Sequence, residues 1–519
     1  MTQVFAGHKR YLGDIPVPEG ARLVGYAALV AGLGLDGVPA NPALTFDTHT
    51  RHTDFDGWKL VAARQAPSDT FQDHLDYALV HERVDLALLK AAFAAVDASD
   101  VKKYVLDRPT GTPNRQAWFL YEWLTGRQIG IADDARGNYV PALDPQSYVT
   151  PEGRRSQRHR VIDNMGGTPQ FCPVIRRTGD DMSGRLTRLR AQISQVTSST
   201  PPALLRRAAS SLLLGETVTT YAIEGIRPPR DKLERWGKAI LQAGRTPLGE
   251  AEITRLQALV LADGINEPLG YRTKQNYVGS FDREFRAAPE RVNPRPEDVR
   301  PLMTAWESWV REGSRHLDPV TAAAAASFSF VYIHPLADGN GRLHRYMLHH
   351  VLSERGLVPP GIVFPVSMPI ADKVERYKAV LNAFDARAMS ATRWRPGVHG
   401  GVEVLNDASD VYRFPDLTEE SNFVQDCVDK AAFDLFPEEV RTIDKADRVT
   451  DAIRSRADMS EERIRDFLMF TRQNPERKLP KKRARNEFKD LSPETISELE
   501  EIVDRYFGDE TELVESPKP

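Results

Sequence analysis

The sequence predicts an all-α fold that carries one short β-hairpin. Residues 60–130 place apolar side chains at mixed three- and four-residue spacings, the pattern of a helix with one buried face. Residues 318–356 read as two helices joined by a tight turn. The segment 273–285 differs, because it alternates weakly and carries Gly279, which suits a hairpin. Together these observations favour helices packed on helices, with the hairpin at one side.

The chain of 519 residues is long enough for roughly three domains, and we divide it into 1–195, 196–400 and 401–519. The first region is mainly helical, with a helix stop at Gly126, and it ends in a loop-rich stretch, 132–181. The boundary near 195 precedes a polar cluster that contains two prolines.

The second region opens with a helix at about 202–225, which we expect to be interrupted at Gly215 and closed by the segment 225–229. A later helix has a clear start, because Asp318 can cap it and a proline follows at its first position. Pro335 disfavours helical geometry in the preceding residue, so this helix should end at His334.

The third region looks mainly helical and highly charged, with a basic cluster at 476–485. Such a cluster could contact nucleic acid, and a winged-helix-like domain is one possibility for 401–519. Acidic residues flank the cluster, however, so a solvated amphipathic helix is the favoured interpretation and nucleic acid is an unlikely partner.

The composition sets limits on the function. A net charge of -4 does not favour a general nucleic-acid or membrane-surface protein. No apolar run approaches the roughly 20 residues of a membrane span, and no secretory signal is evident. The two cysteines, Cys172 and Cys427, lie far apart without metal-ligand spacing, so we expect free thiols and a cytoplasmic location.

The segment 334–345 combines features that suit a bound polyphosphate. Its two glycines let the backbone approach a ligand just before a helix, whose free N–H groups and dipole favour an anion. Arg342 and Arg345 share one face of that helix, and His349 continues the face. Paired guanidinium groups suit a polyphosphate better than a single carboxylate.

Two further side chains complete this chemistry. Asp338 offers a hard oxygen ligand for Mg²⁺, which needs only one or two protein carboxylates when it is bound to nucleotide phosphates. His334 can act as a general base near neutral pH. Taken singly, each feature has a plain structural explanation: a turn, a solvated arginine pair, or a packing histidine.

The segment resembles the signature of the Fic family, His-Pro-Phe-x-(Asp/Glu)-Gly-Asn-Gly-Arg-x-x-Arg. One specified position differs, because Leu336 stands where phenylalanine is usual, which is an apolar exchange. The resemblance implies an all-helical Fic core within 196–400 and a flap, 273–285, that docks an extended segment of a target protein.

The resemblance also implies an activity: with Mg²⁺, AMP is transferred from ATP to a Tyr, Thr or Ser hydroxyl of a target protein. The sequence identifies neither the target protein nor the oligomeric state. Self-modification is a further possibility. His334 would be the base and Asp338 the metal ligand. The phosphates would be held by Gly339, Asn340, Gly341, Arg342 and Arg345.

An upstream segment, Thr220 to Gly225, matches the pattern (Ser/Thr)-x-x-x-Glu-(Gly/Asn) of the helix that restrains many Fic enzymes. The resemblance implies that Glu224 pairs with Arg345 and so keeps the γ-phosphate away. A solvated Glu224 at a helix end is the alternative. A second alternative is a hydrolase that removes AMP, in which Glu224 orients a water, and a third is a non-catalytic regulator that binds nucleic acid.

Three histidines and two residues of a later helix give weaker signals. His344, His349 and His350 lack the other ligands of a metal site, so we expect a helix surface there. Tyr377 and Asn382 lie where family members often line the adenine pocket, and core packing is an equal alternative.

Overall fold

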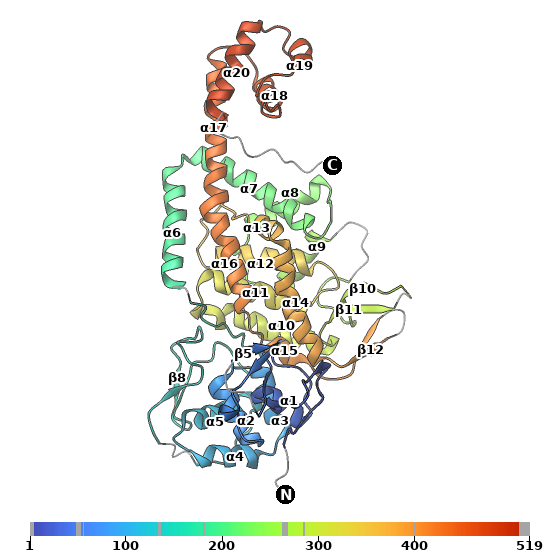
Figure 1. The fold of residues 1–519 in the computed structure, drawn as a ribbon. Helices are drawn as coiled ribbons and strands as arrows, with labels where there is room; N and C mark the ends of the chain where they lie inside the picture. Colours follow the sequence, from blue (N-terminus) through green and yellow to red (C-terminus); the bar gives the residue numbers. More distant parts are fainter. Residues whose placement is uncertain are drawn as a thin grey trace.

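The computed structural model describes residues 5–47, 53–55, 57–132, 136–179, 182–261, 268–283, 286–397 and 401–507. Figure 1 shows an N-terminal body, a helical core above it, and a group of C-terminal helices that stands away from the core on the long helix α17 (Phe436–Arg454). The hydrophobic clusters follow the same division, although the cluster of the core extends back to Phe171. Helices dominate and the strands are short, which confirms the predicted fold class.

The N-terminal body combines helices with small sheets. Polar side chains cap its helices: Thr70, Asp85 and Asp97 each accept a hydrogen bond from a backbone N–H of the first turn. Gly126 ends α5 in the left-handed conformation, as expected. The elements are α1 (Gly25–Leu33), α2 (Phe71–His81), α3 (Leu86–Ala95), α4 (Ala98–Asp107), α5 (Thr112–Thr125), a 3-10 turn (Ala63–Gln65), β1 (Tyr11–Leu12), β2 (Ile15–Pro16), β3 (Arg22–Val24), β4 (Ala43–Thr45), β5 (Thr53–Phe55), β6 (Trp58–Leu60), β7 (Val140–Pro141), β8 (Arg154–Ser156) and β9 (Val161–Asp163).

The sequence did not reveal the strands of this body. They form a four-stranded sheet of order β3-β4-β6-β5, a three-stranded sheet of order β7-β9-β8, and the pair β1-β2. Each strand has two or three residues, which is too short for an alternating pattern to stand out. The sheet of β7, β8 and β9 lies within 132–181, where the sequence predicted loops.

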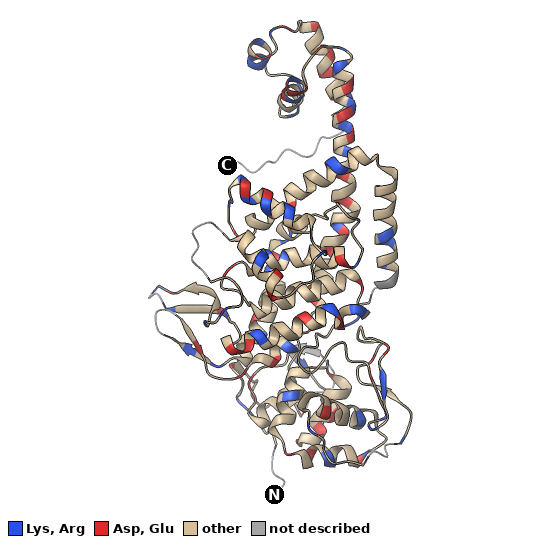
Figure 2. Cartoon of the chain, turned by 180° about the vertical axis from the view of Figure 1, so that it is seen from behind, with Lys and Arg blue, Asp and Glu red and all other residues tan. Residues whose placement is uncertain are grey.

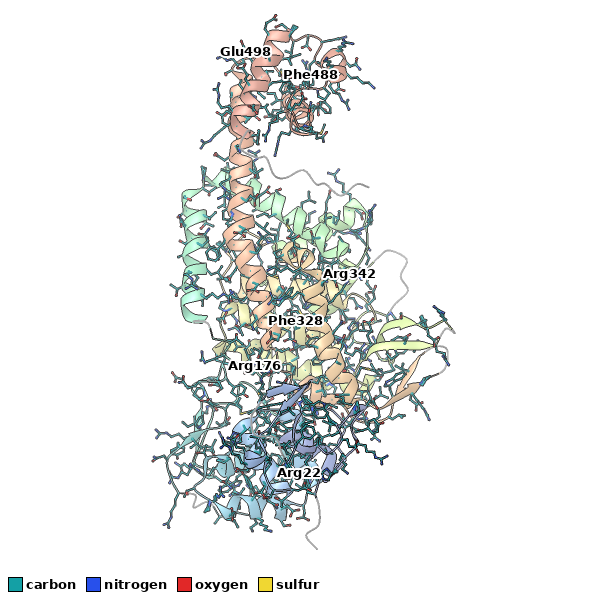
Figure 3. The ribbon with its side chains drawn as sticks, in the orientation of Figure 1. Arg22, Arg176, Phe328, Arg342, Phe488 and Glu498 are labelled. Atoms are coloured by element: carbon teal, nitrogen blue, oxygen red, sulfur yellow. The ribbon has the colours of Figure 1, made fainter. Side chains whose placement is uncertain are left out.

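The core is built around α11 (Pro319–Ile333), all of whose residues are buried. Asp318 caps this helix through Val320 and Thr321, as predicted. The other elements are α6 (Met182–Ser199), α7 (Pro202–Ala222), α8 (Arg230–Leu241), α9 (Glu250–Val260), α10 (Pro296–Arg311), a 3-10 turn (Gly313–His316), α12 (Asn340–Glu354), α13 (Ser367–Asp372), α14 (Val374–Ala391), α15 (Ser409–Arg413), α16 (Thr418–Lys430), β10 (Tyr277–Phe281), β11 (Ala287–Val292), β12 (Trp394–Pro396) and β13 (Val402–Val404). Figure 3 places Phe328 of α11 and Arg342 of α12 in this central region.

The hairpin lies further along the chain than expected. Strands β10 and β11 pair antiparallel from Tyr277↔Val292 to Phe281↔Ala287, whereas the sequence suggested 273–285; residues 284 and 285 are outside the described part. A bulge follows Val278, and Gly279 has a φ of 145°. A Cβ at Gly279 would approach the backbone oxygen of Ala288 to 2.5 Å, which explains the glycine.

The expected break in α7 was wrong, and the helices do not follow the expected region boundaries closely. Helix α7 continues through Gly215, where a Cβ would lie 3.3 Å from Sδ of Met368, so the glycine permits close packing and does not interrupt the helix. The expected boundary near 195 falls inside α6, and buried residues of α16 belong to the core although they follow 400.

The C-terminal group has its own small hydrophobic cluster, which includes Phe488 (Figure 3). Its elements are a π-helical turn (Ala431–Leu435), α17, α18 (Glu461–Arg472), α19 (Lys481–Asn486) and α20 (Pro493–Phe507). The described residues from 405 to 507 contain helices and no strand, so this part lacks the β-hairpin of a winged helix. Helix α19 has no buried residue, and Figure 2 shows basic and acidic residues interspersed along α17.

Candidate functional site

The predicted segment forms a tight turn between α11 and α12. His334 ends α11 with φ 52° and ψ 57°, a left-handed conformation that turns the chain away from the helix axis. The side chain of Asn340 closes the turn, because its amide donates to the carbonyl of Leu336 at 2.9 Å and accepts from the N–H of Leu336 at 3.0 Å. Gly339 has φ 96°, and a Cβ there would lie 3.2 Å from Val260.

The Asn340 side chain is therefore used inside the protein. The sequence placed Asn340 among the phosphate-binding residues, but its amide already makes two hydrogen bonds within the turn, and the residue is 2% exposed. Its remaining contribution to an anion is the backbone N–H at the start of α12. The N–H groups of that first turn have no acceptor within the helix.

His334 is held in an orientation that suits a proton acceptor. Its Nδ1 lies 3.1 Å from the carbonyl oxygen of Val331 and 3.3 Å from Nη2 of Arg291, which itself donates to the same carbonyl. Since Nη2 of Arg291 already donates to the carbonyl of Val331, we assign the proton of the neutral ring to Nδ1, which lies closer to that carbonyl oxygen, and this leaves Nε2 free to accept. Burial of the ring and the charge of Arg291 lower the pKa of His334 to about 3, so the imidazole is neutral at physiological pH.

Arg291 is a site residue that sequence reasoning missed. It is 3% exposed, comes from strand β11 of the hairpin, and forms an ion pair with Asp385 of α14. The sequence signal for Arg291 was weak, because a positively charged residue in a strand is ordinarily exposed to solvent. A second missed residue, Arg272, donates from Nε to the carbonyl of His334 at 2.9 Å and from its backbone to that of Pro335 at 2.8 Å. These contacts fix the base of the hairpin to the turn.

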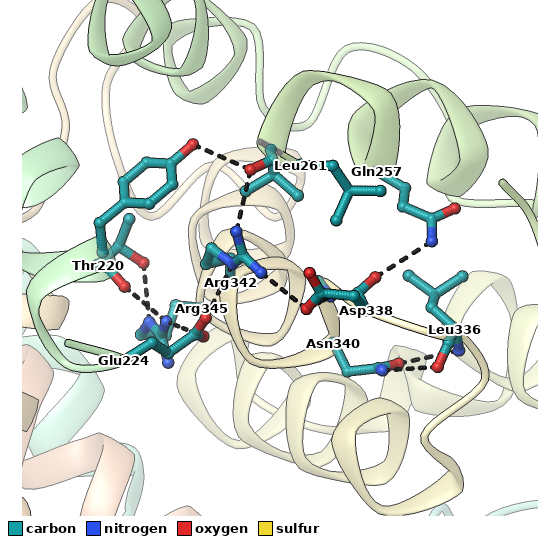
Figure 4. A network of polar contacts seen from close by, with 12 residues as sticks. Thr220, Glu224, Gln257, Leu261, Leu336, Asp338, Asn340, Arg342 and Arg345 are labelled. Carbon is teal, nitrogen blue, oxygen red and sulfur yellow. Dashed lines mark hydrogen bonds and ion pairs between the residues drawn. The ribbon is translucent and has the colours of Figure 1, made fainter. Parts of the chain in front are cut away.

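The two arginines of α12 are buried, and each contacts at least one acidic side chain. Arg342 donates from Nη2 to Oδ1 of Asp338 at 2.9 Å and from Nη1 to the carbonyl of Val260 at 3.0 Å. Its Nε lies 2.8 Å from Oε2 of Glu224, an ion-pair distance whose geometry is not that of a hydrogen bond. Figure 4 shows how these groups converge.

Arg345 makes the contact with Glu224 that the sequence resemblance implied. Its Nη2 donates to Oε1 of Glu224 at 2.6 Å and to the carbonyl of Thr220 at 2.6 Å, and its Nε donates to Oγ1 of Thr220 at 2.8 Å. Glu224 lies just beyond the end of α7, with a side chain 25% exposed. It is therefore not the solvated residue of the alternative interpretation.

The carboxylate of Glu224 also lies against the first turn of α12. A Cβ added to Gly341 would come within 2.4 Å of Oε1 of Glu224. The carboxylate thus occupies the position that the helix start and the two arginines create for an anion.

Asp338 suits a metal ion that arrives with a nucleotide. Its Oδ1 accepts from the N–H of Gly339 at 2.6 Å and from Arg342, and the side chain is 40% exposed. Among the described residues, no group of three or more His, Cys, Asp and Glu could hold a metal by itself. A single carboxylate fits Mg²⁺ carried by phosphates, and does not fit a metal site made by the protein alone.

Other residues lie elsewhere than expected. His344, His349 and His350 are buried, so the predicted helix surface was wrong. Tyr377 is 6% exposed, and its ring stacks near His344 and Phe423, with centroids 6.0 and 5.9 Å away, which favours core packing over an adenine pocket. Asn382 is exposed on α14.

Two further expectations concern the whole chain. Among the described residues, no helix is long and apolar enough to span a membrane. Cys172 and Cys427 are both buried and unpaired, as expected.

Comparison with known proteins agrees with the geometry of the turn. The model of the Fic/DOC family matches residues 247–352, which contain the hairpin, His334 and both arginines. "Protein adenylyltransferase Fic" of Drosophila virilis is 38% identical over 94 residues, or 18% of this chain and 17% of that protein. The protein of the same name from Drosophila melanogaster is 37% identical over 94 residues, with the same shares. The chain thus spans about a sixth of the length of these relatives.

Solved structures of Fic proteins also match. One is a Fic domain containing signaling protein from Bacteroides thetaiotaomicron, with a TM-score of 0.38 and 18% identity, covering 50% of this chain and 97% of that one. Another is a Fic family protein from Desulfovibrio desulfuricans, with a TM-score of 0.33 and 19% identity, covering 50% and 75%. The family match at 247–352 and the named relatives support a Fic domain in this chain.

Proposed function

We propose that this protein transfers AMP from ATP to a hydroxyl group of a target protein, and that Glu224 restrains the reaction. The observation that carries the proposal is the anion position on α12. Two buried arginines and the helix start converge there, and a carboxylate from outside the Fic segment fills it. The names of the matching relatives support the reaction class.

Each side chain has a defined task in this reaction. The N–H groups at Asn340 and Gly341, with Arg342, hold the α- and β-phosphates, and Arg345 holds the γ-phosphate; the N–H of Gly339 already donates to Asp338. His334 accepts the hydroxyl proton at Nε2 while the oxygen attacks the α-phosphorus, and the bond to pyrophosphate breaks. Asp338 would hold Mg²⁺, which would neutralise charge on the phosphates. Catalysis then rests on positioning and on charge stabilisation.

The restraint follows from the geometry of Glu224. Arg345 cannot hold a γ-phosphate while its Nη2 is bound to that carboxylate. A phosphate at the start of α12 would also meet the negative charge directly. We therefore expect low activity until Glu224 leaves this position.

We expect an extended segment of the target protein to bind at the hairpin, and self-modification is part of the same proposal. The outer strand β10 carries the exposed Phe281, 59% accessible, as a contact for such a segment. A cytoplasmic location, where ATP is plentiful and thiols stay reduced, is part of the same proposal.

Removal of AMP is the second candidate, because Glu224 is held by two arginines and could orient a water. Intact-mass analysis separates the two. Glu224→Gly is incubated with ATP, Mg²⁺ and a cell lysate, with Glu224→Gly/His334→Ala as the matched control. We expect proteins that gain one AMP in the first sample alone. If instead Glu224→Gly adds no AMP and loses the ability to release AMP from modified protein, the hydrolase is correct.

A further inference from the structure

Helix α7, with the two residues that follow it, meets α12 at three evenly spaced points. Glu216 contacts His349, with Oε1 2.7 Å from Nε2, and Thr220 accepts from Arg345 four residues later. Glu224 follows after another four residues and lies against Gly341. The residue numbers of the partners fall by four along α12 while those on the α7 side rise by four, so the helices run antiparallel. We call these three contacts the α7–α12 contact row.

The first contact of the row is deeply buried. Glu216 is 0% exposed and His349 is 7% exposed. The second oxygen of Glu216 accepts from the N–H of Ser367 at 2.8 Å, at the start of α13. Both carboxylate oxygens are therefore in use, and the side chain is fixed between α12 and α13. The close approach of α13 to Gly215 places this anchor on a tightly packed face of α7.

We propose that the Glu216–His349 pair is a positioning device that sets the register of α7 on α12 and thereby keeps Glu224 over the two arginines. The inference rests on the proposed restraint by Glu224. Apolar contacts hold helices together but tolerate small shifts, whereas a buried polar pair has one arrangement that satisfies its hydrogen bonds; setting register is the best-attested role of such pairs.

The geometry explains how the pair acts at a distance. At 1.5 Å per residue, Glu216 lies about 12 Å along the chain from Glu224, and His349 lies about 6 Å from Arg345. Neither Glu216 nor His349 has a place in the proposed mechanism. Glu224, by contrast, sits past the last residue of α7, so its position depends on where that helix ends relative to α12.

The test measures AMP transfer by Glu216→Ala, Glu224→Gly and the double variant, each checked for a cooperative unfolding transition. We expect Glu216→Ala to raise transfer by about 5-fold or more, the lower end of ordinary coupling between sites. In the Glu224→Gly background the same change should add nothing, because the carboxylate that it releases is already gone. A merely structural role would change the rate equally in both backgrounds.

Three further variants keep the test decisive. Glu216→Gln retains the size of the side chain; its amide oxygen can accept from Ser367 and its NH2 group can donate to Nε2 of a neutral His349, so this variant should stay close to wild type. Thr217→Ala is the matched control, because Thr217 is 1% exposed on the same helix and its hydroxyl bonds to Leu213 within α7. If Glu216→Ala does not fold, Glu216→Leu combined with His349→Leu replaces the pair by apolar groups, which folded proteins often tolerate.

The outcomes separate this inference from the function on which it rests. No gain in Glu224→Gly would reject the restraint itself. A gain in Glu224→Gly without a gain in folded Glu216→Ala, or in the double leucine variant if the alanine variant does not fold, would reject the positioning role alone. A gain in Thr217→Ala as large as in Glu216→Ala would also reject it, since any loosening of α7 would then suffice.

Discussion

Replacing Glu224 by glutamine tests the restraint with the smallest change in shape. The substitution removes one negative charge and keeps the side-chain volume. In the native arrangement the carboxylate accepts a charge-assisted hydrogen bond from Arg345 at 2.6 Å and lies 2.8 Å from Nε of Arg342. ATP must displace both contacts before its phosphates can reach the arginines, so the substitution should strengthen ATP binding.

The structure gives the order of magnitude. A hydrogen bond to a charged group contributes about 1.5–3 kcal/mol, and the second ion pair adds a smaller amount because it lacks hydrogen-bond geometry. Displacement should therefore cost ATP about 2–4 kcal/mol, equivalent to ~30- to 1,000-fold in affinity. Part of this cost persists in Glu224→Gln, because an amide still occupies the space, so we expect a gain of at least ~10-fold.

Titration calorimetry with ATP and Mg²⁺ measures the effect, in a His334→Ala background that prevents turnover. The matched control is Glu234→Gln, which makes the same change of net charge at an exposed pair with Arg230 on α8. Adding Arg345→Ala should reduce the gain, because Arg345 is what the substitution frees. An affinity that changes less than threefold, or a gain shared by Glu234→Gln, would refute the reasoning.

Three other predictions address the remaining site residues. In the Glu224→Gly background, His334→Ala should lower AMP transfer by about 10²- to 10⁴-fold while ATP affinity stays close to that of its parent, because the imidazole acts on the hydroxyl; equal losses in both would contradict this. Asp338→Ala should abolish transfer in the same background, as should EDTA; activity that survives metal removal would take Asp338 out of its role. His344→Leu should raise the free energy of unfolding by about 1–3 kcal/mol, because both ring nitrogens of His344 are buried without a hydrogen-bond partner in the described structure. Burial lowers the pKa of His344 to about 3. Between about pH 6.5 and pH 3 the histidine is therefore protonated in the unfolded chain but neutral in the native state, so stability is lost as the pH falls through this range. His344→Leu should reduce the slope of unfolding free energy against pH by about 1.4 kcal/mol per pH unit, measured by denaturant unfolding from pH 6 to 4. An unchanged slope would contradict this account of His344.

The part of the site that could be predicted is the part that is contiguous in sequence. Residues 334–345 form one turn and one helix start, so their spacing alone indicates which groups face an anion. The pairing of Glu224 with Arg345 was reached through the family pattern, and the structure places the two at 2.6 Å. No periodicity in the sequence would have brought these positions together.

The contacts that escaped prediction join distant segments. Arg291 reaches His334 from the hairpin, and Glu216 reaches His349 from α7. Each looks like an ordinary charged residue within its own element, because burial is decided by the packing of other helices. Gly215 led to a wrong prediction in the same way, since it permits the close approach of α13 and does not break α7.

The charges of the site explain which carboxylate must yield to a nucleotide. Arg342 and Arg345 are matched by Asp338 and Glu224, so the site is balanced as it stands. Asp338 belongs to the turn itself and is fixed by the N–H of the next residue. Glu224 comes from outside the matched segment 247–352 and lies past the last residue of α7. On the proposed function, a triphosphate therefore replaces Glu224 and keeps Asp338, and control of the reaction resides in whatever holds α7 in place.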